Sequence, residues 1–510
     1  MREALPMWKK EATMAVVPEV AKHYGRLKNY INGEWVDVGT GEYFETTNPA
    51  MGDVIAEAPI ASRNDVEAAI SAAYEAFKKW RDVPFRDRAK KVFNLRERCA
   101  AKAEWMARIL VQDHGCTIDE GRGTCARIVE NIEAAGSSMF GPYRGEHVDQ
   151  LATGIDCYQI REPAGVFLIM TPGNIPTHAW SSFVPYALAC GCTVIVKPSR
   201  QVPVAADSVM KVTAEIGLPP GVVNLVHMGP DRELNNVILS DPRIKGVGLI
   251  GSTRVSKELF ELCGRYGKRS SLNGNGKNWI VVMADAPVDK AVGYLLRGCF
   301  GMSGQRCLGS DNVAVLGDDR RYNAVKEAFL AASKTMKMGY GLDESIELGP
   351  LTSMQGKEKV EQFIEAGLHL GAKLLLDGRA ARVKGYEKGY FLGPSIFEKV
   401  TPEMDPLAKE EAFGPLANLL RPGDLDEAIG WINGGRYGHS ACIVTESGKA
   451  ARKFIRECEV GNVGVNAGIP QPYSFFGLGS KKDSFFGMSK SRMDSVKLFL
   501  DEKTVTLRWV

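Results

Sequence analysis

Residues 165–176 read GVFLIMTPGNIP, an apolar run that passes into a loop containing glycine and proline. Similar runs follow as TVIVKPS (193–199), VVNLVHMG (222–229) and IKGVGLIGST (244–253), with helix-forming segments such as AADSVMKVTAEIG (205–217) between them. Short apolar strands that alternate with helices are typical of a parallel sheet covered on both faces. This stretch therefore predicts an α/β fold that binds its ligands in the loops after the strands.

The chain before this stretch predicts long helices. Apolar residues recur at helical spacing over residues 63–80, 85–115 and 119–136, with Asp65 near the cap of the first of these helices. Ahead of them, Asn32-Gly33 is a turn signal between short β-prone runs and predicts a hairpin.

Other segments predict a ribbon and a second α/β unit. HVDQLATGIDCYQIR (147–161) is typical of two short strands that leave the body of a domain, and the strand-like tail 496–510 could pair with them. SLNGNGKNWIVVM (271–283) begins the second alternating unit. Residues 1–25 are expected to form an amphipathic extension without chemistry of its own.

Composition narrows the class of protein. A chain of 510 residues predicts two or three domains, and 45% hydrophobic with 25% charged residues is ordinary for a globular protein. A net charge of +3 gives no reason to expect nucleic acid or a membrane as partner. The eleven cysteines form no CxxC and no Cys/His metal pattern, so we expect reduced thiols in the cytoplasm and no metal site.

One cysteine stands in an unusual setting, FGMSGQRCLGS (300–310). Gly301 and Gly304 allow close approach of the backbone to a ligand, and Arg306 beside Cys307 is expected to favour the reactive thiolate. On these residues alone, a buried structural cysteine is an equally good interpretation.

The strand ending at IGST offers a second candidate site. No GxGxxG follows any strand, so the usual dinucleotide fingerprint is absent. Gly251 and Ser252 nevertheless open a helix whose N-terminus would suit a pyrophosphate. An ordinary helix cap by Ser252 or Thr253 explains the same residues nearly as well.

Five loops in a fixed order carry a resemblance to a known family. They are GNIP (173–176), VKPS (196–199), IGST (250–253), GQRC (304–307) and EEAFGPL (410–416). Together they resemble the aldehyde dehydrogenase superfamily, over about Tyr30 to Val505. GKRSSLNGNGKN (267–278) and GSKKDSFFG (479–487) are similar to its methylmalonate-semialdehyde dehydrogenase branch, which transfers its acyl group to coenzyme A.

The resemblance implies an NAD(P)-dependent oxidation. Cys307 would attack the aldehyde to form a thiohemiacetal and then a thioester, and Asn174 would stabilise the oxyanion. The resemblance implies that the cofactor is bound by the following residues: Lys197, Ser199, Arg200, Gly251, Ser252, Glu411 and Phe413.

Asn273 occupies the position of the general-base glutamate of hydrolytic relatives. Because an amide cannot accept a proton at neutral pH, release of the acyl group to coenzyme A is favoured over hydrolysis to the free acid. Hydrolysis with water activated by another group, such as a cofactor-site glutamate, stays open. A catalytically silent binding protein with the same fold is a remote third alternative.

Three arginines bear on ligand choice. Arg200 replaces the glutamate that NAD-preferring relatives use for the ribose, so NAD and NADP both stay open. Arg127 and Arg306 match arginines around the substrate carboxylate in the methylmalonate branch, which implies a short anionic aldehyde. A solvated helix face is the alternative for Arg127, and Gly173, where many relatives place an aromatic residue, implies a different pocket.

The resemblance also implies the architecture. A Rossmann-type cofactor domain would comprise residues 25–144 and 162–272, followed by an α/β catalytic domain at 273–486. A small β bridging domain would comprise 145–161 and 487–510, and through it the chain would form a homodimer or homotetramer.

Overall fold

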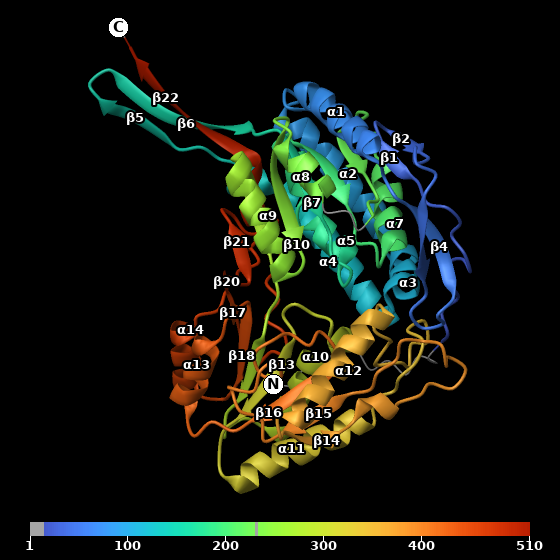
Figure 1. Ribbon diagram of the computed structural model, residues 1–510. Helices are drawn as coiled ribbons and strands as arrows, with labels where there is room; N and C mark the ends of the chain where they lie inside the picture. The colour runs from blue at the N-terminus through green and yellow to red at the C-terminus, as the bar shows by residue number, and fades with distance from the viewer. Residues whose placement is uncertain (1–14, 230–232, 510) are drawn as a thin grey trace.

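The computed structural model describes residues 15–229 and 233–509, and shows two α/β bodies with a long ribbon projecting from one of them (Figure 1). Expectations for residues 1–14 lie outside the described residues. Among the helices of the described ranges, none is both long enough and apolar enough to cross a bilayer.

The first body is built on an eight-stranded sheet in the order β2-β1-β9-β8-β7-β10-β11-β21. Its strands are β1 (Asn29–Ile31), β2 (Glu34–Val36), β7 (Val166–Met170), β8 (Thr193–Lys197), β9 (Val223–Leu225), β10 (Ile244–Ile250), β11 (Arg269–Asn273) and β21 (Phe485–Gly487). The central strands β9, β8, β7, β10 and β11 are parallel. The predicted parallel sheet is confirmed, and so is the hairpin at Asn32-Gly33, which joins β1 to β2.

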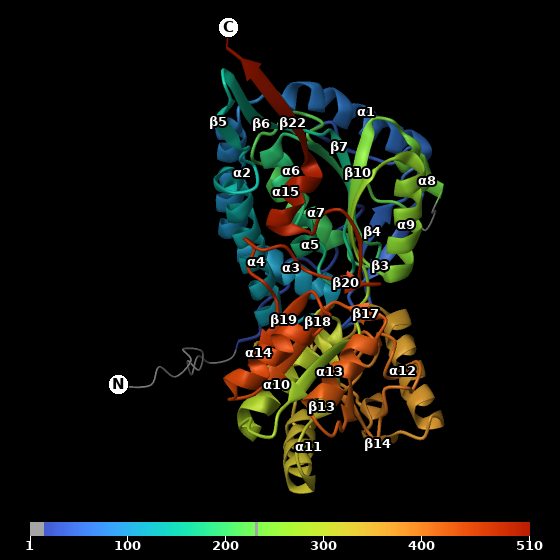
Figure 2. The same ribbon diagram turned by 90° about the vertical axis from the view of Figure 1, so that its left-hand side faces the viewer.

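Helices cover this sheet on both faces (Figure 2). They are α1 (Arg63–Trp80), α2 (Phe85–Ala101), α3 (Ala103–His114), α4 (Ile118–Gly136), α5 (Pro176–Ser181), α6 (Val184–Cys190), α7 (Pro203–Ala214), α8 (Glu233–Ser240) and α9 (Thr253–Tyr266). Asp65 belongs to a capping box with Ser62, as its position suggested. The single helix expected over 85–115 is wrong: it breaks at Lys102, whose φ of −103° and ψ of 11° are not helical.

The second body contains a seven-stranded sheet in the order β14-β15-β16-β13-β12-β18-β19. Its strands are β12 (Asn278–Val282), β13 (Ser310–Val315), β14 (Lys373–Leu376), β15 (Ser395–Glu398), β16 (Leu416–Leu420), β18 (Ser440–Val444) and β19 (Asn462–Val465). Its helices are α10 (Val288–Phe300), α11 (Asp319–Lys334), α12 (Met354–His369), α13 (Leu425–Gly434) and α14 (Gly448–Glu457). This is the predicted second α/β unit, and all its pairings except β14–β15 are parallel.

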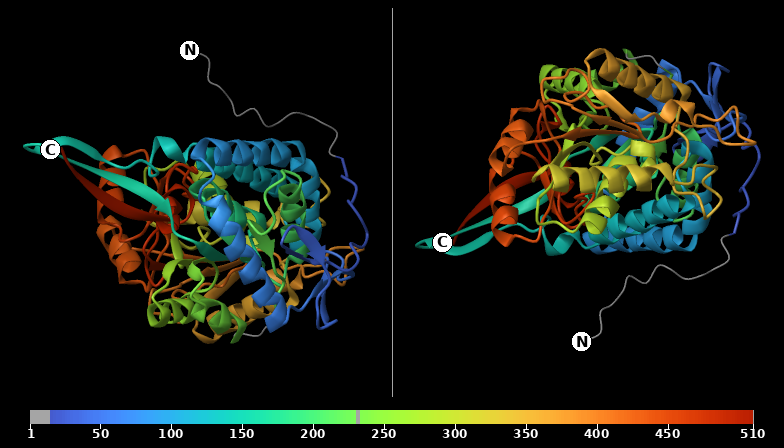
Figure 3. Two further views of the ribbon diagram at one scale, coloured as in Figure 1. Left: turned by 90° about the horizontal axis from the view of Figure 1, so that it is seen from above. Right: turned by 90° about the horizontal axis from the view of Figure 1, so that it is seen from below.

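Three strands make the projecting ribbon: β5 (His147–Ala152), β6 (Ile155–Pro163) and β22 (Leu500–Arg508). The predicted pairing of the tail with the ribbon is confirmed, because β22 runs antiparallel to β6 along its whole length. Figure 3 shows the ribbon extending well beyond both bodies in the end-on views. Just before β22, the short helices η4 (Arg492–Ser495) and α15 (Val496–Phe499) pack back onto the first body, where they contact α6.

Candidate active site

The loop that carries Cys307 is held in an uncommon backbone conformation. It follows α10 through the short helix η2 (Gly301–Gly304), in which Met302, Ser303 and Gly304 have φ values of 52°, 54° and 72°. A Cβ atom on Gly304 would lie 1.9 Å from the carbonyl oxygen of Gly414, so only glycine fits there. Such strain persists where the surroundings fix it, and it is common at functional sites.

Glu120, in the first turn of α4, holds the Cys307 loop in this conformation. Its Oε1 accepts a hydrogen bond from the Met302 backbone N–H at 2.5 Å and pairs with Arg306 Nη2 at 3.3 Å. The hydroxyl of Ser303 donates to the Gly349 carbonyl at 2.7 Å on the opposite side. The strained loop is therefore anchored to both bodies of the molecule.

Two asparagines bracket the cysteine. Asn174, in the loop between β7 and α5, is 7% exposed and donates from Nδ2 to the Gln305 carbonyl at 2.9 Å. Asn278, at the start of β12, donates to the Cys307 carbonyl at 2.8 Å. The structure thus brings Asn174 against the Cys307 loop, and one of its two amide N–H groups stays available for another acceptor.

The thiol of Cys307 is less acidic than the sequence suggested. Burial, followed by the charge of Glu411, raises its pKa to about 11. Arg306 pairs with Glu120, but its charge still interacts with Cys307, so the expectation that it favours the thiolate stays a prediction. Arg492 is a further cation that lowers the pKa of Cys307.

Glu411 and Phe413 lie together against the cysteine loop. Glu411 accepts hydrogen bonds from the side chain of Asn275 and from the Gly276 N–H at 3.0 Å. Burial raises its pKa to about 7. Phe413, with a φ of 58°, lines the same small pocket as Glu411 and Arg306. A carboxylate near the thiol is therefore poised to change its charge near neutral pH.

The end of β8 presents two cations. Lys197 is partly buried, and burial followed by the charge of Arg200 lowers its pKa. No described side chain accepts a hydrogen bond from its Nζ. Arg200 is exposed and lies over the ring of Phe44, 5.2 Å from the centroid. An ammonium left without a partner at a strand end suits the hydroxyl and phosphate groups of a dinucleotide.

Several polar groups of the loop IGST (250–253) already have hydrogen-bonding partners within the protein. Ser252 caps α9 by accepting from the Val255 N–H, and the Thr253 N–H donates to Asn275 Oδ1 at 2.7 Å. Gly251 donates its N–H to the Asn273 carbonyl. The ordinary cap is thus present, so a phosphate here would use the N–H groups that remain.

Ser199, the remaining cofactor candidate, also has a local partner. Its hydroxyl accepts from the Gln201 N–H at 3.2 Å. Gln201 in turn fills the space beside Gly173, since a Cβ there would lie 2.2 Å from Gln201 Oε1. An aromatic side chain at Gly173 would need that space, so the expected difference in the pocket has a physical cause.

Arg127 lies on α4, two turns beyond Glu120, and is neither free nor fully solvated. It pairs with Glu130 at 2.5 Å and stacks over Tyr473, 4.8 Å from the ring centroid. Glu130 also accepts from the Ser474 N–H at 2.7 Å. Both arginines predicted to bind substrate, Arg127 and Arg306, therefore already have a carboxylate partner.

Asn273 is the last residue of β11, and its side-chain amide forms no hydrogen bond with the described residues. The side chain is 1% exposed, and neither Oδ1 nor Nδ2 has a hydrogen-bonding partner among the described residues. Buried amides are normally paired, so an orphan of this kind points to a ligand or water that completes it.

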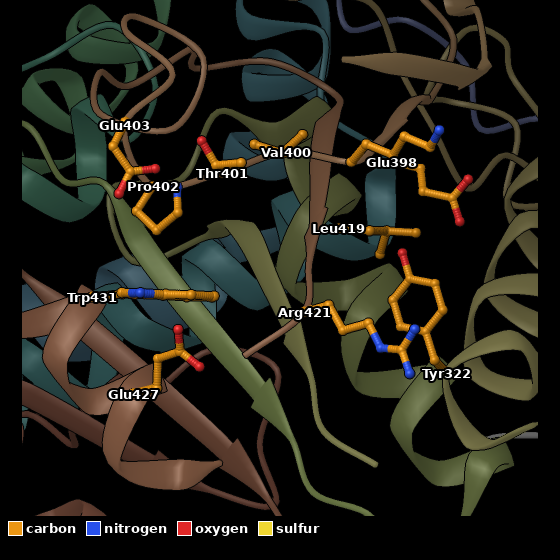
Figure 4. Close-up of a pocket in the computed structure, with 11 residues that line it drawn as sticks. Tyr322, Glu398, Val400, Thr401, Pro402, Glu403, Leu419, Arg421, Glu427 and Trp431 are labelled. Atoms are coloured by element: carbon orange, nitrogen blue, oxygen red, sulfur yellow. The ribbon is translucent and has the colours of Figure 1, made fainter. Parts of the chain in front are cut away.

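A larger pocket lies elsewhere. It has a volume of about 630 Å³ and is lined by Tyr322, Arg421 and Trp431 together with three glutamates (Figure 4). Arg421 turns over the Tyr322 ring at 5.1 Å. None of the predicted site residues lines this pocket, so size alone does not identify the site.

Three residues of the site have no signal in the sequence: Glu120, Asn275 and Arg492. Glu120 reads as an ordinary capping-box residue with Thr117, which it also is. Arg492 lies in the charged segment KSRMDSVK, 185 positions after Cys307 in a chain of 510. Only the packing of η4 against α4 and α6 brings it back to the site.

The comparisons with known proteins agree with this geometry. The model of the aldehyde dehydrogenase family matches residues 35–505. The chain is 37% identical over 485 residues to malonate-semialdehyde dehydrogenase 1 of Geobacillus kaustophilus, covering 95% of this chain and 98% of the relative.

Two solved structures have a fold similar to that of this chain. A protein of Sinorhizobium meliloti 1021, named as a methylmalonate-semialdehyde dehydrogenase and solved with NAD, superposes with a TM-score of 0.92 at 31% identity, covering 95% and 98% of the two chains. An NADP-dependent enzyme of E. coli gives 0.89 at 29% identity, again over 95% and 98%. The chain belongs to the aldehyde dehydrogenase family.

Proposed function

We propose that this aldehyde dehydrogenase oxidises a short anionic aldehyde of the malonate-semialdehyde type with NAD or NADP and transfers the acyl group to coenzyme A. The proposal combines the family with three local observations: the position of Cys307, the amide at Asn273 and the arginines on the substrate side. The names of the relatives support the substrate class.

Cys307 is the nucleophile. Its sulfur adds to the aldehyde carbon, and the carbonyl oxygen takes the negative charge beside Asn174 Nδ2 and the Cys307 N–H. Collapse of this thiohemiacetal expels a hydride from carbon and leaves a thioester. Glu120 anchors the loop that carries this site by accepting from the Met302 N–H, which supports a fixed position for the loop.

The residues present fit a nicotinamide dinucleotide. Lys197 offers an unpaired ammonium at the strand end, and Glu411 offers a buried carboxylate on the cysteine side. When bound, the nicotinamide supplies the hydride acceptor. Lys197 would hold one ribose and Glu411 the other, with Phe413 packing beside it.

The acyl acceptor follows from Asn273. An amide cannot take a proton from water, so hydrolysis of the thioester lacks its usual base, whereas a thiol needs less help. Coenzyme A therefore attacks the thioester carbon, and Cys307 leaves as the thiolate. This single position carries the proposal of an acylating enzyme.

Glu411 supports one alternative, hydrolysis to the free acid. Its pKa of about 7 would let it accept a proton from water at physiological pH. Two features oppose this role: Glu411 is tied to Asn275 and Gly276, and it is the candidate for ribose binding.

Assembly and location are the remaining proposals. The β5–β6–β22 ribbon projects from the body and exposes Val148, Leu151 and Trp509, which supports a homo-oligomer formed through it. All eleven cysteines are unpaired, which supports the cytoplasm as location.

Product analysis tests the function. Purified enzyme is incubated with malonate semialdehyde and either NAD or NADP, with and without coenzyme A, and the products are identified by mass spectrometry. We expect an acyl-CoA and a strong dependence of the rate on coenzyme A. Fast formation of free acid at a rate indifferent to coenzyme A would favour the hydrolytic alternative.

A further inference from the structure

Arg492 is a buried arginine whose charge acts on Cys307, and no motif in the sequence assigns it a role. It is 3% exposed and opens η4 with a φ of 65°, a conformation that residues other than glycine rarely adopt. Its backbone N–H donates to the Ser182 carbonyl at 2.9 Å. The fold thus holds this side chain in the interior at the expense of backbone strain.

The guanidinium of Arg492 has no acidic partner. It donates from Nη1 to the Pro472 carbonyl and lies 3.4 Å from His178 Nε2 through Nη2, while its Nε has no partner. Within residues 15–229 and 233–509, no carboxylate forms an ion pair with it. Arg127 and Arg306, in contrast, each pair with a glutamate.

His178 cannot neutralise this charge. Burial, with the charges of Arg492 and Arg127, lowers the pKa of His178 to about 3, so its ring is neutral. Burial lowers the pKa of Arg492 only to about 10, so the guanidinium remains cationic at neutral pH. A buried charge without a counter-ion is costly, and a bound anion would relieve that cost.

The charge of Arg492 is coupled to that of the reaction centre. Its charge acts on Cys307 and on Arg127, so all three side chains share one electrostatic environment. His178 lies on α5, which starts two residues after the oxyanion candidate Asn174. The packing of α4 against α5 and η4 brings together the helices that carry Arg127, His178 and Arg492.

We infer that Arg492 binds the carboxylate of the aldehyde substrate, with Arg127 as a second, weaker cation. The inference rests on the proposed function, because it requires an anionic aldehyde. Nε and Nη2 form the edge of the guanidinium that binds a carboxylate side-on with two hydrogen bonds. Nε is free and the contact of Nη2 with His178 is long, so that edge is available.

The first test compares substrates. Arg492→Met removes the charge and keeps an unbranched apolar chain, and Lys497→Met is a matched control that removes an exposed cation five residues away. With NAD(P) and coenzyme A, we expect Arg492→Met to lose about 10²-fold in kcat/KM for malonate semialdehyde, mainly through KM. The loss for propanal, which reports the effect of Arg492 on the acidity of Cys307, should be at least about tenfold smaller, and the control should change neither substrate.

The second test needs no turnover. Alkylation of Cys307 by iodoacetate, an anion, is compared with alkylation by neutral iodoacetamide, each relative to free cysteine. The unmodified enzyme should favour iodoacetate, Arg492→Met should lose that preference, and Arg492→Lys should retain part of it, since it keeps the charge without the fork. A purely structural role would slow both reagents alike.

The outcomes separate the inference from the function on which it rests. If the unmodified enzyme does not oxidise malonate semialdehyde, the proposed function fails. If it does, and Arg492→Met impairs both aldehydes equally or neither, Arg492 does not bind the carboxylate. If Arg492→Met does not fold, Arg492→Lys decides: an unchanged KM for malonate semialdehyde together with an unchanged reagent preference overturns the inference.

Discussion

The cations on the cofactor side and on the substrate side of the site differ in whether they have an acidic partner. On the cofactor side, Lys197 and Arg200 have no acidic partner among the described residues, and Arg200 rests on an aromatic ring. On the substrate side, Arg127 and Arg306 are held by glutamates, whereas Arg492 forms no ion pair with a carboxylate in the part of the chain that the structure describes.

This difference gives a rule for assigning roles. A cation that is already paired stabilises the loop or helix that carries it, and Arg306 in the strained cysteine loop is the clearest case. A partly or fully buried cation without a partner is left for a ligand, because the desolvation cost is otherwise uncompensated. The predictions below test the rule on each side.

The largest effect is expected at the sulfur between the two sides. Cys307→Ala should lower aldehyde oxidation by at least about 10⁴-fold, because no other thiol can form the thioester. The measurement is NAD(P)H formation in a single turnover, with dinucleotide binding as the control for an intact fold. Hydride transfer that survives this change would contradict the mechanism.

On the cofactor side, Arg200→Glu should shift the preference between NADP and NAD by about 10²-fold toward NAD. The arginine suits a 2′-phosphate, whereas a carboxylate repels it and accepts from the ribose hydroxyls. The ratio of kcat/KM for the two dinucleotides is the readout. An unchanged ratio would show that Arg200 does not face the ribose.

The charge of Glu411 should be visible in the pH dependence of the thiol. Because this carboxylate raises the pKa of Cys307, Glu411→Gln should lower that pKa and increase thiolate at a given pH. Iodoacetamide alkylation of the cofactor-free enzyme, followed from pH 7 to about 10, should be several-fold faster in the variant. Equal or slower alkylation would place Glu411 out of reach of the sulfur.

The smallest effect is expected at Arg127, which Glu130 already engages. Arg127→Ala should raise the KM for malonate semialdehyde by about threefold and leave that for propanal nearly unchanged. The comparison with Arg492→Met is the informative one. A larger loss at Arg127 than at Arg492 would mean that the paired arginine exchanges its glutamate for the substrate, against the rule.

Much of this arrangement could be predicted because it depends on local pattern. Apolar runs ending in Gly or Pro loops determine the parallel strands, so Lys197 ends β8 and Ser252 follows β10, as expected. The break at Lys102 could not be predicted, since the flanking residues favour helix and neither glycine nor proline marks it.

The charge pairing could not be predicted, because it depends on contacts between distant segments. Arg306 next to Cys307 suggests an activated thiol, but Glu120, far earlier in the chain, takes up its charge. Arg492 reaches the site only through the packing of η4 and through a left-handed backbone that no sequence rule indicates for arginine. The resemblance located Cys307 and Asn174 but could not show which of the charged side chains around them are paired.

The fate of the acyl group on Cys307 tests the central claim most directly. The enzyme is mixed with malonate semialdehyde and NAD(P) without coenzyme A, and the intact protein is weighed by mass spectrometry over time. We predict an acyl adduct on Cys307 that persists for minutes and disappears within the mixing time when coenzyme A is added, with acyl-CoA formed in equal amount. An adduct that clears equally fast without coenzyme A would contradict the account.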